Sequence, residues 1–125
     1  MGVSFAQREK YEDAILCYSK GLEYAPSAVG FANRGHAHLS RGALQEALDD
    51  FTSALQLRKT YAEVLAWRAD VYERQGTAEA LGLAACDLTA AMTLEPQQTR
   101  GLVGVLESVL QQATSLLAKA DLEVR

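Results

Sequence analysis

The sequence predicts an all-α fold in which antiparallel pairs of helices stack into a solenoid, and three observations support this. Alanine and leucine dominate a chain of 125 residues that contains only two prolines, Pro26 and Pro96, so long helices fit between them. A pattern of small and large apolar residues recurs along the chain at helical spacing. A second pattern precedes each copy of the first and twice ends in glycine.

The composition is that expected of a folded, soluble, cytoplasmic domain. Hydrophobic residues make up 49% of the chain and charged residues 22%. The net charge is -4 and the basic residues are dispersed, so no nucleic-acid partner is expected. No apolar run reaches the length that a bilayer requires, so no membrane partner is expected. Cys17 and Cys86 lack the CxxC spacing of metal ligands, and no histidine cluster lies near either of them. We expect both to be buried thiols rather than zinc ligands.

The first pattern consists of a small residue, a large apolar residue four positions later and a small residue three positions after that. This spacing puts all three on one face of a helix. The copies recur with a period of about 34 residues, and the third copy comes three positions late. The three copies are Ala14/Tyr18/Gly21, Ala47/Phe51/Ala54 and Ala84/Leu88/Ala91.

The second pattern marks another helix before each of these, so each unit has two helices. Gly42 and Gly76 sit where the first helix ends, and glycine supplies the left-handed C-cap that a tight turn needs. Small residues such as Gly35 and Ala47 let the paired helices approach closely. The copies of this pattern, one repeat period apart, are Gly2/Phe5, Gly35/His38/Gly42 and Ala69/Tyr72/Gly76.

This arrangement resembles the tetratricopeptide repeat, a 34-residue helix–turn–helix unit. The resemblance covers residues 1–96 and implies three units: 1–27, clipped at its start, 28–61, and 62–98, which has three extra residues. Residues 97–125 then form a C-terminal capping helix over the last open face. The residues that carry the resemblance are Gly2, Phe5, Tyr11, Ala14, Tyr18, Gly21 and Pro26, then Gly35, His38, Gly42, Leu44, Ala47, Phe51 and Ala54, then Leu65, Ala69, Tyr72, Gly76, Ala84, Leu88, Ala91 and Pro96.

The resemblance implies a concave groove, lined by the first helix of each pair, that receives an extended peptide or a helix of a partner protein. Trp67 is either an anchor in this groove or a core residue packed with Val64 and Val71. The candidate groove residues are Asn33, His36, Ser40, Glu63, Trp67, Asp70, Arg74 and Arg100. The same helix offsets add Val29, Ala32, Leu39, Ala66, Glu73, Val103, Glu107 and Gln111.

One class of these domains clamps the C-terminal carboxylate of heat-shock chaperones with five lysine, asparagine and arginine residues. Only Asn33 matches that set, because Glu63 and Trp67 occupy the places of a lysine and an arginine in the third unit. Glu63 would repel a carboxylate. We therefore expect a groove that does not bind chaperone tails in this way.

Nothing in the sequence indicates catalysis, a cofactor or a metal site, so no enzyme is expected. His36 and His38 point about 200° apart on a helix and cannot share a metal, and His38 fits a core position. Asp49 and Asp50 are adjacent and are expected to be solvated.

Two functional hypotheses follow. The first is an adaptor or scaffold module that binds a protein or peptide in its groove. The alternative is a structural subunit, docked in a larger assembly or self-associating as a homo-oligomer. The clipped first unit favours the alternative, since its edge near Val3 and Phe5 would need covering.

Overall fold

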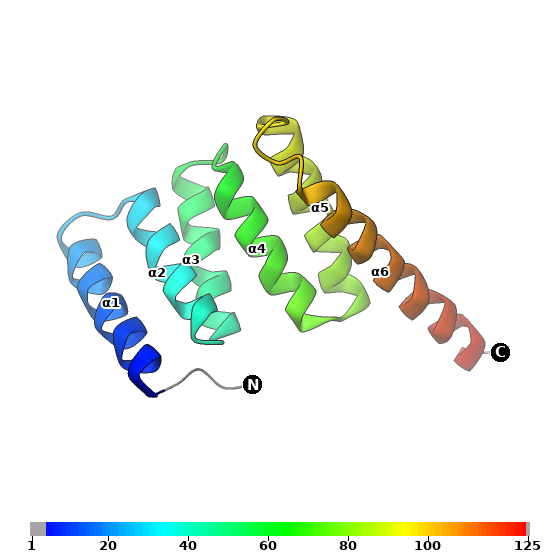
Figure 1. Ribbon diagram of the computed structural model, residues 1–125, viewed down its shortest axis with the longest axis horizontal. Helices are drawn as coiled ribbons and strands as arrows, with labels where there is room; N and C mark the ends of the chain where they lie inside the picture. Colours follow the sequence, from blue (N-terminus) through cyan, green and yellow to red (C-terminus); the bar gives the residue numbers. More distant parts are fainter. Residues whose placement is uncertain (1–4, 125) are drawn as a thin grey trace. The chain divides into compact units, whose positions relative to one another are not determined.

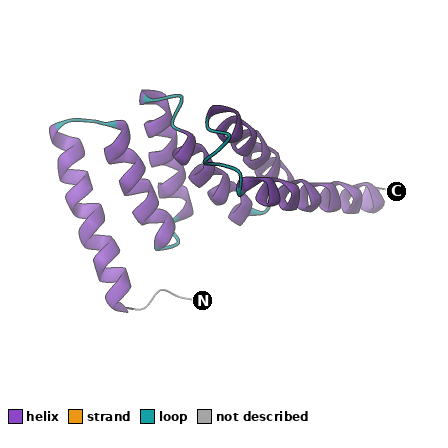
Figure 2. Cartoon of the chain, turned by 45° about the horizontal axis from the view of Figure 1, so that its top comes forward, coloured by secondary structure: helices purple, strands orange, loops and turns teal. Residues whose placement is uncertain are grey.

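The structure is a computed structural model that describes the backbone of residues 5–124 and the side chains of residues 7–120. The described backbone is helical, with short connecting loops and no strand among the described residues (Figures 1 and 2). The expected all-α fold of antiparallel helices is therefore confirmed. The helices are α1 (Phe5–Tyr24), α2 (Ala28–Ser40), α3 (Leu44–Leu57), α4 (Ala62–Gln75), α5 (Ala78–Leu94) and α6 (Leu102–Val124).

The chain divides into two compact units, residues 1–64 and 65–125, and the boundary falls inside α4. In the first unit, α2 packs against both α1 and α3. In the second unit, α6 packs against α5. Consecutive helices run in opposite directions within each unit (Figure 1).

The first unit is held together by small residues that let large side chains approach. Phe51 is fully buried on α3. A Cβ atom at Gly35 would lie 2.8 Å from the Phe51 ring, so only glycine fits at this point of α2. This contact confirms the expected close approach of the paired helices. It also ties the position of α2 to that of α3.

The start of the chain differs from the expected clipped helix pair. Residues Phe5–Tyr24 form one continuous helix, with no turn between its two halves. The reason is readable in the sequence, because Glu9 stands where the repeat places the glycine equivalent to Gly42. Without a residue that readily adopts a left-handed conformation, the helix continues. Gly2 and Val3, part of the expected first helix, lie outside the described residues.

The glycines that end the first helices of the two later pairs adopt the expected conformation. Gly42 has a φ of 85° and Gly76 a φ of 72°, which confirms both as left-handed caps. Hydroxyl groups cap the starts of two helices. The Oγ of Ser27 accepts a hydrogen bond from the Gly30 N–H at 3.0 Å, and Thr77 does the same for Ala80 at 3.1 Å.

The second unit has its own core. Leu81 and Val109 are completely shielded from solvent, and they join α5 to α6. The three extra residues of the third repeat lie within α5, which has 17 residues where α3 has 14. The turn before α5 is not lengthened, since only Gly76 and Thr77 separate it from α4.

Helix α6 covers α5 with one part of its apolar surface. Val109 is fully buried, and Leu102 and Leu106 pack beside it. Leu110 and Leu117 remain 49% and 62% exposed, so the apolar surface of α6 is wider than the part that α5 covers.

The left-handed caps can be tested by substitution. Gly42→Ala should lower the free energy of unfolding by about 1 kcal/mol, because a Cβ atom disfavours a positive φ. Gly82→Ala is the matched control, since Gly82 lies inside α5 and a Cβ there meets nothing within 4 Å. That change should raise the free energy of unfolding by roughly 0.5–1 kcal/mol, because alanine favours helix. Urea titration followed by circular dichroism measures both, and effects of the same sign would contradict the assignment.

Candidate functional site

In the first unit, the predicted groove residues share one face of α2. Asn33, His36 and Ser40 are spaced by three and four residues, which aligns them along the helix. His36 is exposed, and Asn33 and Ser40 are half-buried. Ala32 and Leu39 were also expected on this face. That prediction is wrong, because both side chains are buried.

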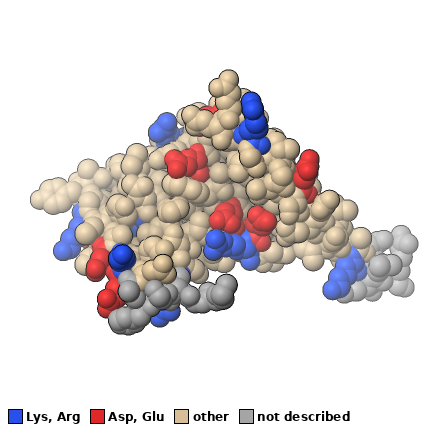
Figure 3. Space-filling model, in the orientation of Figure 1, with Lys and Arg blue, Asp and Glu red and all other residues tan. Residues whose placement is uncertain are grey.

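In the second unit, Trp67, Asp70 and Arg74 form the equivalent face of α4, each one repeat period after its counterpart on α2. Arg74 is exposed and donates to the Asp70 carboxylate at 3.3 Å. Trp67 is half-buried, whereas Val64 and Val71 are fully buried. Acidic and basic side chains lie side by side over α4 on the surface shown in Figure 3.

The two remaining groove candidates lie at the ends of the helices. Glu63 is exposed in the first turn of α4 and belongs to the first unit. Arg100 is exposed in the turn before α6. The predicted groove residues therefore divide between the two units. The first unit holds Asn33, His36 and Ser40 on one face of α2 and Glu63 at the start of α4, and the second unit holds Trp67, Asp70, Arg74 and Arg100.

Helix α6 lies beside the end of α4 in the second unit and forms one wall of an open hollow. The Gln112 side-chain amide donates to Glu73 at 3.3 Å and to the Ser108 hydroxyl at 3.2 Å. Between this wall and the α4–α5 turn lies an open hollow of about 460 Å³. Its lining residues are Gly76, Leu81, Ser108, Gln111, Gln112, Ser115 and Leu116.

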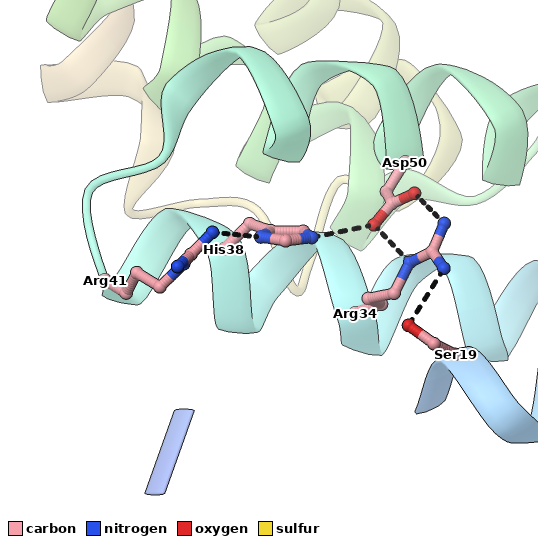
Figure 4. Close-up of polar contacts among 5 residues, drawn as sticks. All are labelled: Ser19, Arg34, His38, Arg41 and Asp50. Carbon is pink, nitrogen blue, oxygen red and sulfur yellow. Dashed lines mark hydrogen bonds and ion pairs between the residues drawn. The ribbon is translucent and has the colours of Figure 1, made fainter. Parts of the chain in front are cut away.

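Behind the α2 face, a buried ion pair joins the two helices of the pair. The Arg34 guanidinium donates from Nε and Nη2 to the two carboxylate oxygens of Asp50, at 2.8 and 2.7 Å (Figure 4). Asp50 is only 5% exposed. Arg34 also donates from Nη1 to the Ser19 hydroxyl of α1 at 3.2 Å. One side chain thus connects all three complete helices of the first unit.

The second unit repeats this arrangement. Arg68 on α4 donates to both carboxylate oxygens of Asp87 on α5, at 2.7 and 2.9 Å. Asp87 is 6% exposed. We call Arg34–Asp50 and Arg68–Asp87 the two buried bridges. Each arginine directly follows a groove position, Asn33 or Trp67, in the sequence.

The buried bridges were not predicted from the sequence, and the expectation that Asp50 is solvated is wrong. Asp49 is exposed as expected, but Asp50 lies one residue further around the helix and faces α2. The sequence repeat nevertheless contained a pattern that could have predicted these ion pairs. Each arginine immediately precedes a small anchor of a first helix, and each aspartate stands three residues after a small anchor of a second helix, Ala47 or Ala84.

The buried bridges restrict the orientation of the first helix in each pair. Hydrogen bonds to Asp50 and Asp87 raise the pKa of Arg34 and Arg68 above the usual arginine value, so both stay cationic. A planar guanidinium that makes two parallel hydrogen bonds to one carboxylate allows little rotation. The buried bridges therefore hold the first helix of each pair at one rotation about its axis.

His38 is buried on α2, which confirms it as a core histidine. Its Nδ1 lies 3.4 Å from Nη2 of Arg41, which can only donate, so this nitrogen accepts. Nε2 faces Asp50 at 3.7 Å (Figure 4). Burial lowers the pKa of His38, and the nearby Asp50 charge opposes this shift without reversing it. Arg34 already pairs with that carboxylate, so the imidazole remains neutral.

The expectation of buried thiols is wrong, because Cys17 and Cys86 are both free and exposed. Cys86 stands one residue before Asp87, at the outward position that Asp49 occupies in the preceding pair. Within the part of the chain that the structure describes, no three His, Cys, Asp or Glu side chains gather in a way that would hold a metal ion. None of the described helices combines the length and apolarity needed to cross a bilayer.

The helix pairs α2–α3 and α4–α5, each closed by the same buried bridge, define a helix-pair repeat protein. Residues 35–76 match the family model of the TPR repeat, a stretch that runs from the middle of α2 through α3 and α4. The chain therefore contains a tetratricopeptide repeat domain, as the sequence resemblance predicts.

Two curated relatives are similar in sequence. The mitochondrial import receptor subunit TOM70 of Saccharomyces cerevisiae is 35% identical over 75 residues, which cover 60% of this chain and 12% of TOM70. Mouse sperm-associated antigen 1 is 31% identical over 86 residues, which cover 69% of this chain and 9% of that protein. The chain thus spans only a small part of the length of the relatives that it matches.

Two solved structures share the fold. The crystal structure of yeast Tom70 superposes with a TM-score of 0.78 and 29% identity, over 94% of this chain and 24% of that one. The TPR2B domain of yeast Sti1 superposes with a TM-score of 0.70 and 18% identity, over 89% of this chain and 88% of that one.

The buried bridges predict that loss of the arginine lowers stability more than loss of the aspartate does. Arg34→Met should lower the free energy of unfolding by about 3 kcal/mol, because it leaves the Asp50 carboxylate buried without a cation. Asp50→Leu should cost only about 1 kcal/mol, because the Arg34 side chain, 24% exposed, can turn toward water. Arg74→Met removes an exposed pair and should cost about 0.5 kcal/mol or less. Chemical denaturation compares the three variants, and an Arg34→Met effect no larger than that of Arg74→Met would contradict a buried bridge.

The buried, neutral His38 predicts a pH dependence of stability. Its pKa is lower in the folded chain than the value of 6.5 expected when unfolded, so the unfolded chain binds the proton more readily. The stabilising effect is complete above pH 6.5 and is lost as the pH falls from there to the lowered pKa. Between about pH 7.5 and 5.5, the wild-type Tm should fall more steeply than that of His38→Gln. Thermal melts at a series of pH values measure this, and equal slopes would show that His38 is not buried in the neutral form.

Proposed function

We propose that the chain is a non-catalytic protein-interaction module that binds a peptide or helix of a partner protein along the repeated faces of α2 and α4. The observation that carries this proposal is the repetition itself. Asn33, His36 and Ser40 recur one repeat period later as Trp67, Asp70 and Arg74, with side chains that are exposed or half-buried. The buried bridges lie next to these positions and hold α2 and α4 at one rotation about their axes. The two faces are therefore held in place although their own side chains do not form the core.

The comparisons support the coarser part of the proposal. TOM70 is named a mitochondrial import receptor subunit, and the Sti1 domain was solved as a complex with pHsp70. Both are proteins that engage another protein. Arg74 and Asp70 pair with each other, so the polar character of the face is balanced rather than strongly charged at that point.

We further propose that the face does not clamp a chaperone carboxylate. Glu63 is exposed where the clamp needs a lysine, and Trp67 stands where it needs an arginine. A negative charge at Glu63 repels a carboxylate rather than binding it. The cytoplasmic location expected from the composition stays a prediction.

The alternative, a structural subunit in a larger assembly or a homo-oligomer, also stays a prediction. Its expected contact edge near Val3 and Phe5 has no described side chains. Leu16, about three helical turns further along α1, is 56% exposed and favours some covering of this helix.

Site-specific photo-crosslinking tests the proposed function. A benzoyl-phenylalanine placed at His36 or Arg74, the exposed members of the two faces, should crosslink the same partner protein in cells that express the chain. The same probe at Gln56 on α3 or Cys86 on α5, both exposed on second helices, should not. Denaturing gels and mass spectrometry identify the crosslinked species.

Trp67→Ala completes this test, because loss of a large aromatic anchor should weaken the crosslinks from Arg74 by about tenfold or more. Circular dichroism controls for folding. Crosslinks that arise equally from the second helices, or that survive Trp67→Ala unchanged, would place the partner on another surface and contradict the proposal.

A further inference from the structure

The second unit contains a groove whose chemistry can be read. The hollow between α6 and the α4–α5 turn shares Gly76 and Leu116 with a neighbouring hollow of about 360 Å³, so the two form one continuous groove. We call it the α6 groove. The second hollow is lined by Gly76, Thr77, Ala78, Leu116, Lys119 and Ala120.

One wall of the α6 groove is a row of uncharged hydrogen-bonding side chains. Ser108, Gln111, Gln112 and Ser115 recur at three- and four-residue spacing along α6. Amides and hydroxyls both donate and accept hydrogen bonds, as a peptide backbone does. Within the described residues, Gln112 uses its amide on Glu73 and Ser108, while Gln111 forms no side-chain hydrogen bond. This wall suits an extended segment of polypeptide.

The floor of the groove is apolar. Leu81 lies beneath it, fully buried against solvent, and Leu116 is 37% exposed at the point where the two hollows meet. Gly76 leaves the α4–α5 turn without a side chain beside this point. An apolar side chain of the bound segment would cover Leu116 there and remove it from water.

The charges at one end of the groove are not balanced. Asp70 is neutralised by Arg74. Glu73 is half-buried, accepts only the Gln112 amide and has no ion pair within the described residues. Glu107 is exposed one helical turn before Gln111 and likewise has no ion pair among them. Neither carboxylate lines the two hollows, but Glu73 contacts Gln112 of the wall and Glu107 directly precedes Ser108 of the wall. The one charged lining residue, Lys119, belongs to the second hollow, so a ligand that supplies a cation is favoured beside Glu73.

We propose that the α6 groove binds an extended segment of a partner protein that places a lysine or arginine beside Glu73 and an apolar residue on Leu116. This rests on the proposed interaction function and specifies the partner for the second unit. The uncharged wall, the apolar floor and the unpaired carboxylates each match one part of such a segment. An acidic segment would meet Glu73 and Glu107 with like charge.

Selection from a displayed library of random dodecapeptides on the immobilised full chain tests this proposal. The recovered peptides should be enriched in sequences with a lysine or arginine next to an apolar residue. Glu73→Lys should lose these peptides or recover acidic ones. Glu95→Lys is the matched control, because it makes the same charge change at an exposed position of the same unit, outside the α6 groove, and should recover the basic peptides.

A synthetic copy of the most enriched peptide, labelled with fluorescein, extends the test to affinity. Glu73→Gln should weaken its binding about fivefold, which is the scale of one partly exposed ion pair. Binding should also weaken as salt rises from about 0.05 to 0.5 M. Circular dichroism confirms that each variant is folded.

Recovery of the same peptides by wild type and Glu73→Lys would overturn the proposal, as would enrichment of acidic peptides or no enrichment over a blank surface. Any of these results would leave the interaction function itself standing if the crosslinks from His36 and Arg74 are found. Loss of those crosslinks would instead count against the proposed function.

Discussion

A carboxylate that is almost completely removed from water must be paired, and in this chain that requirement joins the two helices of each pair. Asp50 and Asp87 are buried on second helices, and each receives two hydrogen bonds from an arginine on the first helix. A helix that is held by apolar packing alone can rotate slightly about its axis. A bidentate ion pair restricts this rotation much more strongly. The rotation fixed in this way decides which side chains of α2 and α4 face outward.

The consequence for function follows from the position of the arginines. Arg34 comes directly after Asn33, and Arg68 directly after Trp67, so one residue anchors the helix and its neighbour faces the proposed binding surface. Helix α1 lacks this pair. Cys17 occupies the place of the aspartate there, and the Ser19 hydroxyl of α1 accepts a hydrogen bond from Arg34 of α2.

Much of the fold could be predicted from the sequence because it depends on period and on glycine. The recurrence of Gly35/Gly42 as Ala69/Gly76 predicts two helix pairs, and the positive φ of both terminal glycines follows from their place after each helix. The continuous α1 was also readable from Glu9, which replaces a glycine. The buried bridges were harder to find, because Asp49 and Asp50 differ only by a step of about 100° around the helix and the partner of Asp50 is 16 residues away. Cys17 lies on a part of α1 that no described helix covers, and its own sequence neighbourhood does not reveal this.

Trp67 is the only tryptophan in the chain and directly precedes Arg68, so its fluorescence reports on the rotation that the second buried bridge maintains. In an Arg68→Met variant that remains folded by circular dichroism, the Trp67 emission maximum and its quenching by acrylamide should both change, because α4 is free to rotate. In Arg74→Met, which removes only the exposed pair with Asp70, both should match the wild type. Unchanged emission and quenching in Arg68→Met would show that the buried bridge does not set the orientation of the binding face.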